Sequence, residues 1–260
     1  MSRNLSIHSI KVKKMKAMKT AGILGGLGPQ STALFYQEII RLSQSRRIVE
    51  YPRMIINSMS IWDFSNKMND KDQLFELLSK EIERIQDQTD FLAMVCNTAH
   101  CIIDHLRQHS SIPLLAIQEE VVKKVREDGL RKVGIIGTSI TSRSQIYKNE
   151  LDLYGIASYA LPDRVLDLFN QLIFEEMLRG QSYDAMHIQM LEHTRLLIDQ
   201  GCEGIILGCT ELPLFISQEE VPVPLYASTQ ILAESVINQC LGQEHDEVAV
   251  DGPQNSTASY

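Results

Sequence analysis

Two cysteines, Cys96 and Cys209, each end an apolar segment, and the two segments resemble each other. Residues 91–95 (FLAMV) lead into the first cysteine, and residues 204–208 (GIILG) lead into the second. A thiolate is a base and a thiol is an acid. A pair of them on opposite faces of one carbon can therefore remove a proton from one side and return a proton to the other. The pair predicts proton-transfer chemistry at a carbon atom.

Two further landmarks repeat at nearly the same separation as the cysteines. Residues 22–25 (GILG) are echoed by residues 134–137 (GIIG), and residues 112–116 (IPLLA) are echoed by residues 223–227 (VPLYA). Three matched landmarks in one order predict a duplicated α/β unit. Each copy would then contribute one thiol to a shared cleft.

The elements that must position the thiols alternate along the chain. Short apolar runs predict strands over residues 20–24, 53–57, 91–95, 114–116, 132–136, 204–207 and 224–226. The segments between them carry the apolar periodicity of helices. This alternation predicts two pseudo-symmetric three-layer α/β/α domains with parallel sheets and a ligand cleft between them. Such sheets bind ligands outside the carboxyl ends of their strands.

The same pattern predicts how the chain is divided. Residues 19–128 would form a first α/β domain with Cys96, and residues 129–227 a second with Cys209. A last helix over residues 228–241 could pack back on the first domain. Outside these parts, residues 1–18 are polar and basic, typical of a flexible extension, and residues 244–260 have the composition of a disordered tail.

Composition narrows the classes of partner. A net charge of −8 argues against a nucleic-acid partner, which needs clustered Lys and Arg. No apolar run approaches the roughly 18 residues of a membrane span. Five cysteines without an export signal indicate a reducing, cytoplasmic location. Because the chain has no Cys-x-x-Cys pair, we expect no metal site. A small molecule remains the expected partner.

A glycine-rich turn, residues 25–29 (GGLGP), follows the first predicted strand and precedes a helix. Its backbone N–H groups could approach an anion. A dinucleotide fingerprint fails here, because Ser31 stands where the third glycine is needed and no acidic residue ends the second strand. We expect no nucleotide cofactor; the turn suits a small carboxylate.

Each of the paired cysteines is followed by a predicted helix N-terminus, whose free N–H groups would lower the thiol pKa towards neutrality. His100 would either tune Cys96 or cap its helix, and Glu211 would meet an incoming ammonium group. The remaining cysteines are expected to be core or surface residues, and the single tryptophan to serve packing: Cys101, Cys202, Cys240 and Trp62.

Residues 96–100 (CNTAH) and 208–211 (GCTE), with the turn at 25–29, closely resemble the aspartate/glutamate racemase family over about residues 19–241. Glu211, where glutamate racemases of cell-wall synthesis usually carry His, favours the aspartate racemase branch. The resemblance implies a homodimer and a cofactor-independent racemisation of an acidic amino acid, aspartate first and glutamate next. One thiolate would abstract the α-proton and the other thiol would protonate the carbanion.

The resemblance also implies which residues bind the substrate. The α-carboxylate would be bound around the two cysteines and the glycine-rich turn, by Leu27, Gly28, Asn97, Thr98, Ala99 and Thr210. Some aspartate racemases use a basic residue for the side-chain carboxylate. In this chain, Asp167 occupies one of the positions at which those racemases carry the basic residue, and Phe64 lies near the other. Arg164, one helical turn before Asp167, is therefore the expected substitute.

Three other readings remain open at this point. Relatives on the same fold isomerise maleate or decarboxylate malonates, although they usually lack one cysteine. A non-catalytic amino-acid-binding protein would keep the anion-binding turns but has no use for two matched thiols. A redox sensor would need Cys96 and Cys209 close enough for a disulfide, with roughly 4.4–6.8 Å between their Cα atoms.

Overall fold

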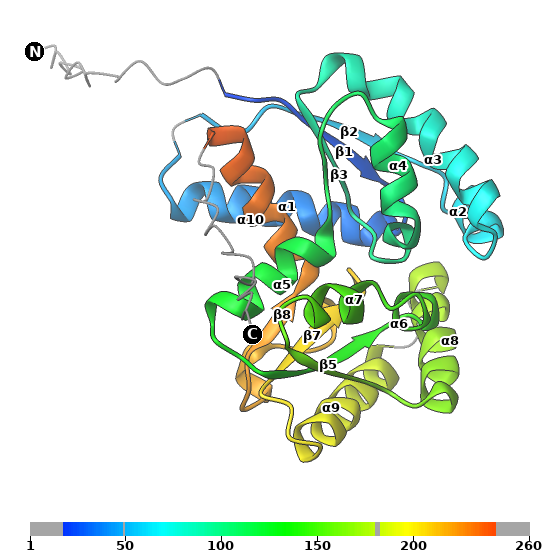
Figure 1. The fold of residues 1–260 in the computed structure, drawn as a ribbon, viewed down its shortest axis with the longest axis vertical. Helices are drawn as coiled ribbons and strands as arrows, with labels where there is room; N and C mark the ends of the chain where they lie inside the picture. The colour runs from blue at the N-terminus through cyan, green and yellow to red at the C-terminus, as the bar shows by residue number, and fades with distance from the viewer. Residues whose placement is uncertain (1–17, 49, 180–182, 243–260) are drawn as a thin grey trace, which may run out of the picture.

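The computed structural model describes residues 18–48, 50–179 and 183–242. The predicted N-terminal extension, apart from Met18, and the predicted tail lie outside the described residues. Two four-stranded parallel sheets form the framework (Figure 1). The first contains β1 (Ala21–Gly25), β2 (Met54–Ser58), β3 (Phe91–Met94) and β4 (Leu114–Leu115). The second contains β5 (Lys132–Gly137), β6 (Ala157–Ala160), β7 (Gly204–Gly208) and β8 (Leu225–Ala227).

Both sheets have the same strand order. It is β2-β1-β3-β4 in the first and β6-β5-β7-β8 in the second, and every pair is parallel. The central strands β3 and β7 occupy equivalent places; Cys209 directly follows β7, and Cys96 follows β3 after one intervening residue. The expectation of two parallel α/β sheets built on one repeated plan is thus confirmed.

Ten α-helices of the described chain cover these sheets. They are α1 (Pro29–Ser45), α2 (Ile61–Lys67), α3 (Lys71–Ile85), α4 (Ile103–His109), α5 (Ile117–Glu127), α6 (Ser139–Arg143), α7 (Ile146–Asp152), α8 (Asp163–Arg179), α9 (Tyr183–Asp199) and α10 (Ser228–Leu241). None of the described helices is long and apolar enough to cross a membrane.

Strand alternation decides which helices cover which face of the first sheet. Successive residues of a strand point to opposite faces. Leu24 of β1 therefore packs into the core cluster that contains Leu78 of α3, whereas Ile23 packs into the cluster that contains residues of α1 and α10. Both faces are buried, which is why β1 and β3 read as continuous apolar runs.

The second sheet is built in the same way. Leu207 of β7 packs with residues of α8 and α9, and Ile206 packs with residues of α5 and α7. Its edge strand β6 was not predicted. The side chains of β6 are mostly exposed and include Ser158 and Tyr159, so the strand lacks the apolar run by which the others were recognised.

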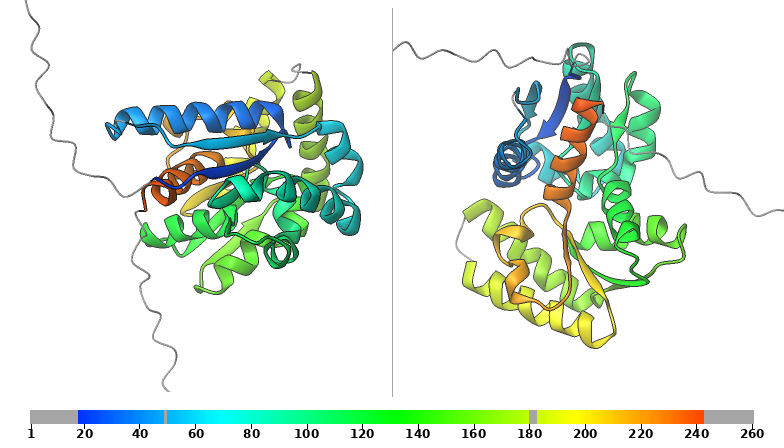
Figure 2. Two further views of the ribbon diagram at one scale, coloured as in Figure 1. Left: turned by 90° about the horizontal axis from the view of Figure 1, so that it is seen from above. Right: turned by 90° about the vertical axis from the view of Figure 1, so that its left-hand side faces the viewer.

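The last helix runs back across the molecule. α10 follows β8 of the second sheet but lies beside α1 and the first sheet (Figures 1 and 2). Its Val236 and Ile237 pack in the core cluster that contains residues of α1 and β1. Arg46, at the end of α1, pairs with Glu234 of α10. The division of the chain into domains at about residue 128 stays a prediction.

Candidate active site

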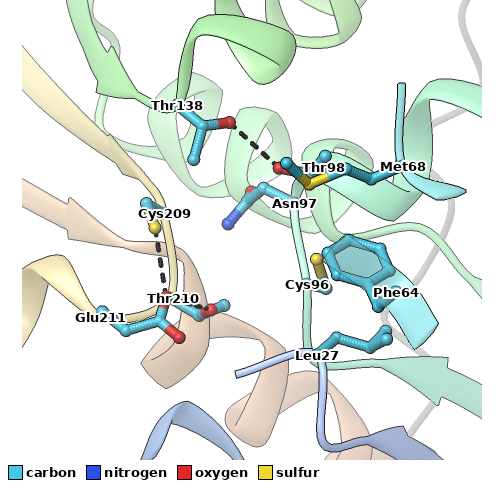
Figure 3. Close-up of a pocket in the computed structure, with 10 residues that line it drawn as sticks. All are labelled: Leu27, Phe64, Met68, Cys96, Asn97, Thr98, Thr138, Cys209, Thr210 and Glu211. Atoms are coloured by element: carbon cyan, nitrogen blue, oxygen red, sulfur yellow. Dashed lines mark hydrogen bonds between the residues drawn. The ribbon is translucent and has the colours of Figure 1, made fainter. Parts of the chain in front are cut away.

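Both cysteines of the pair line one pocket, which we call the thiol pocket (Figure 3). Its volume is about 320 Å³ including its opening, and the lining residues are Leu27, Phe64, Met68, Cys96, Asn97, Thr98, Thr138, Cys209, Thr210 and Glu211. Most of them follow strands β1, β3, β5 and β7. Parallel strands of a repeated plan bring these carboxyl ends together. Each cysteine is only 5% exposed, and Figure 3 shows the two sulfur atoms on facing walls.

A buried carboxylate sits beside one thiol. The Sγ of Cys209 donates a hydrogen bond to Oε2 of Glu211 at 3.1 Å, and the Thr210 hydroxyl donates to the same oxygen at 3.0 Å. The other oxygen, Oε1, is buried beside Ser31, whose single hydroxyl proton is donated to the Gly28 carbonyl at 2.9 Å. Burial raises the pKa of Glu211 above its usual value.

The two thiols are poorly acidic in this state. Burial raises the pKa of Cys96 to about 12 and that of Cys209 well above its ordinary value, and the charge of Glu211 raises both further. The N–H groups of Thr98 and Ala99 lower the pKa of Cys96, as predicted, but desolvation outweighs them. The prediction of near-neutral thiol pKa values was therefore wrong.

Sequence and fold comparisons identify the relatives of this chain. The model of the Asp/Glu/Hydantoin racemase family matches residues 24–236. The chain belongs to this family. The broad-specificity amino-acid racemase RacX of Bacillus subtilis (strain 168) is 29% identical over 229 residues, 86% of this chain and 99% of that protein.

Solved racemase structures share the fold. An aspartate racemase homologue from Pyrococcus horikoshii OT3 superposes with a TM-score of 0.71 at 28% identity, covering 86% of this chain and 99% of that one. Glutamate racemase from Francisella tularensis, solved with D-glutamate, superposes with a TM-score of 0.63 at 18% identity, covering 87% of this chain and 82% of that one. At 18% identity, the likeness to the glutamate racemase shows only that the fold is shared.

Asn97 of this racemase-family pocket is held by the second half of the chain. Its amide nitrogen donates to the Ser228 hydroxyl at 2.9 Å, and its oxygen accepts a hydrogen bond from the Tyr147 hydroxyl. Ser228 in turn donates to the Leu207 carbonyl at 2.8 Å. The amide carries a second N–H, so Asn97 can hold a fixed orientation and still donate to a ligand.

Three threonine hydroxyls also join the two halves. Thr98 lies 3.0 Å from Thr138, and Thr138 lies 2.9 Å from Thr141. Thr138 was missed by sequence reasoning. It follows residues 134–137 just as the glycine-rich turn follows residues 22–25. The repeat could therefore have indicated Thr138 as a pocket residue. Met68 was also missed, and we find no motif that would have indicated it.

The residue expected to bind a side-chain carboxylate, Arg164, does not line the pocket. It is exposed on α8. Asp167 lies on the same helix and pairs with Arg143 at 2.6 Å. Phe64 does line the pocket. The position of Arg164 therefore gives no support to the role predicted for it.

The three other cysteines were expected to be core or surface residues, and Trp62 was expected to pack. All five cysteines are free thiols; Cys202 and Cys240 are buried and Cys101 is partly so. Trp62 is 66% exposed, so the packing role expected of it was wrong. No group of three or more metal-ligating side chains occurs within the described ranges.

His100 holds the backbone of Cys96 in place. The Ile117 N–H donates to His100 Nε2 at 3.1 Å, so the ring proton is on Nδ1, which donates to the Cys96 carbonyl at 2.7 Å. The bond from Ile117 requires the neutral ring, because Nε2 accepts it, and burial lowers the His100 pKa to about 4. His100 is thus a positioning residue for the first thiol.

We expect His100 to make the fold acid-sensitive. Its pKa is lower in the folded than in the unfolded chain, so its contribution is complete above about pH 6.5 and is lost as the pH falls towards 4. The loss should be on the order of 3 kcal/mol in the free energy of unfolding, measured by urea denaturation at several pH values. His100→Gln should flatten this part of the profile, whereas the exposed His105→Gln should not. Equal profiles for the two variants would contradict the assignment.

Gly28 is required by the close approach of Glu211. Its φ of 173° is ordinary extended backbone, but an added Cβ would lie 1.8 Å from Glu211 Oε1. Gly28→Ala should therefore displace the carboxylate. We expect a roughly 100-fold loss of racemase activity and about 1–3 kcal/mol of destabilisation. In a Glu211→Ala background the same change should cost much less stability, and strict additivity in this double-mutant cycle would contradict the clash.

Proposed function

We propose that this protein is an amino-acid racemase in which Cys96 and Cys209 are the two acid–base groups. The observation that carries the proposal is that both thiols, from equivalent places in two sheets of one plan, line the same small pocket from facing walls. For one enantiomer, one cysteine as thiolate takes the α-proton, and the other as thiol gives its proton to the opposite face. For the other enantiomer the roles are exchanged.

The α-carboxylate must be bound by fixed donors, because a carbanion beside an unneutralised carboxylate is very unstable. We propose the Asn97 amide, the Thr98 and Thr210 hydroxyls and the backbone at Ala99 for this role, with the turn at Leu27 and Gly28 closing the site. Asn97 and Thr98 are already oriented by Ser228 and Thr138. Such preorganisation avoids the cost of ordering the donors during the reaction.

The raised thiol pKa values fit this chemistry once substrate is bound. The ammonium group of an amino acid brings a positive charge next to Glu211, which offsets the negative charge that disfavours both thiolates. The thiolate that then forms is a stronger base than one of low pKa, as removal of a weakly acidic α-proton demands. Without such a charge, the hydrogen bond from Cys209 Sγ to Glu211 Oε2 keeps the proton on sulfur.

We propose that no cofactor takes part. Two thiols are sufficient as acid and base, and no described lining residue is a lysine that could hold an aldehyde cofactor as an imine. The cytoplasmic location and the homodimer belong to the same proposal. Light scattering of the purified protein tests the dimer.

The proposal is tested with purified, extensively dialysed protein and pure L- and D-amino acids, by chiral chromatography, with a chelator present and no cofactor added. Conversion in both directions is expected. Conversion only after pyridoxal phosphate or a metal is added would contradict the cofactor-free mechanism. Binding without conversion would favour an amino-acid-binding protein, and turnover of maleate instead would favour an isomerase of that type.

A further inference from the structure

The walls of the thiol pocket differ in chemistry. The side chains of Asn97, Thr98, Thr138, Thr210 and Glu211 are polar, whereas those of Leu27, Phe64 and Met68 form an apolar wall beside Cys96 (Figure 3). None of the described lining residues is Lys, Arg or His. The one charged side chain that lines the pocket in the described chain is Glu211, a carboxylate.

The apolar wall is built by α2 and the residue that follows it. Phe64 and Met68 are four positions apart, so they share one face of the helical turn. Phe64 is 3% exposed and packs in a core cluster with Leu27 and Cys96, and Met68 packs against the same cluster. The wall is thus continuous with the core of the first sheet; packing holds Phe64 in place, whereas Met68 is only partly buried.

The cations nearest in the chain lie outside the pocket. Lys67 immediately precedes Met68 but is not among the residues that line the pocket. Arg143, five residues after Thr138, pairs with Asp167 at 2.6 Å and with Asp163 at 3.6 Å. Neither cation therefore lines the pocket, and Arg143 is paired with two carboxylates of α8.

From this we infer that the substrate is an amino acid with an uncharged, apolar side chain, and that Phe64 and Met68 determine this specificity. The inference rests on the proposed racemase function. The polar groups are used by the α-carboxylate and the α-ammonium, so the side chain faces the apolar wall. A side-chain carboxylate would lose its hydration there without a cation in return, and would share the pocket with Glu211.

The apolar wall also predicts breadth of specificity. Burial of an aliphatic or thioether side chain against Phe64 and Met68 is favourable in proportion to the apolar area covered. Methionine is unbranched and adapts to differently shaped neighbours. We therefore expect methionine, leucine and similar side chains to be accepted, in place of the acidic side chain expected from the sequence.

The test compares kcat/KM for L-methionine, L-leucine, L-aspartate and L-glutamate. We expect at least about a 100-fold preference for the apolar pair. Met68→Arg, which places a cation at the partly buried end of the wall, should lower the value for methionine and raise the value for aspartate at least tenfold. Trp62→Arg is the matched control, because Trp62 lies on α2, which Met68 directly follows, and is 66% exposed; it should change neither value.

If Met68→Arg does not fold, Met68→Ala should lower kcat/KM for methionine about tenfold and leave that for aspartate unchanged. Preference of the unmodified protein for aspartate or glutamate, or equal rates for all four, would overturn the inference while the racemase function stands. Absence of turnover with every amino acid would overturn the proposed function itself.

Discussion

Cys96→Ala and Cys209→Ala should each lower racemisation by at least about 1,000-fold, because each removes one of the two groups that exchange protons with the α-carbon. Both residues are small and buried, so alanine should leave the fold nearly intact. Racemisation is measured by polarimetry with each enantiomer as the starting substrate.

The two variants should also differ from each other. Each retains a thiol on one wall, so each should still exchange with solvent the α-proton of the enantiomer that presents it to that wall. Cys101→Ala and Cys202→Ala are matched controls, because neither residue lines the thiol pocket, and both should keep full activity. Normal racemisation by both pocket variants would rule out the two-thiol mechanism.

Glu211→Gln should move two measurements in opposite directions. Loss of the buried negative charge weakens the binding of the substrate ammonium, so kcat/KM should fall about 100-fold. The same charge raises the pKa of both Cys96 and Cys209, so its removal should lower both pKa values. Alkylation by iodoacetamide at about pH 8.5 should therefore become faster while racemisation becomes slower.

The opposite signs separate this role from a structural one. A variant that had merely loosened the pocket would react faster with iodoacetamide at every pH, without a shift in the pH profile. Glu219→Gln, an exposed carboxylate on the same segment, is the control and should change neither measurement. An unchanged alkylation profile in Glu211→Gln would show that this carboxylate does not govern the thiols.

The fold could be predicted because its central strands are buried on both faces. The apolar runs that end at Gly25, Met94 and Gly208 are what a parallel sheet demands, and their repetition exposed the duplicated plan. The edge strand over residues 157–160 has no such demand on its sequence and was missed. Most ends of the predicted strands lie one residue away from the observed ends.

The chemistry of the pocket was only partly accessible from sequence. The pairing of Cys96 with Cys209 follows from the repeat, but the acidity of a thiol depends on how completely it is desolvated, and this is a property of the folded state. Likewise, the place of Arg164 in the helical sequence could not show that its side chain is exposed on α8. The apolar wall at Phe64 and Met68 could not be predicted from the sequence, because it depends on the contact between α2 and the loop after β3.

The most direct test of the two-thiol account is the origin of the α-hydrogen at early conversion in D2O, measured by NMR for both enantiomers of an accepted amino acid. Two monoprotic thiols on opposite faces predict product that carries solvent deuterium, while the recovered substrate retains its original proton. Product that retains the substrate's own α-proton, in either direction, would mean that a single group serves both faces and would contradict the account.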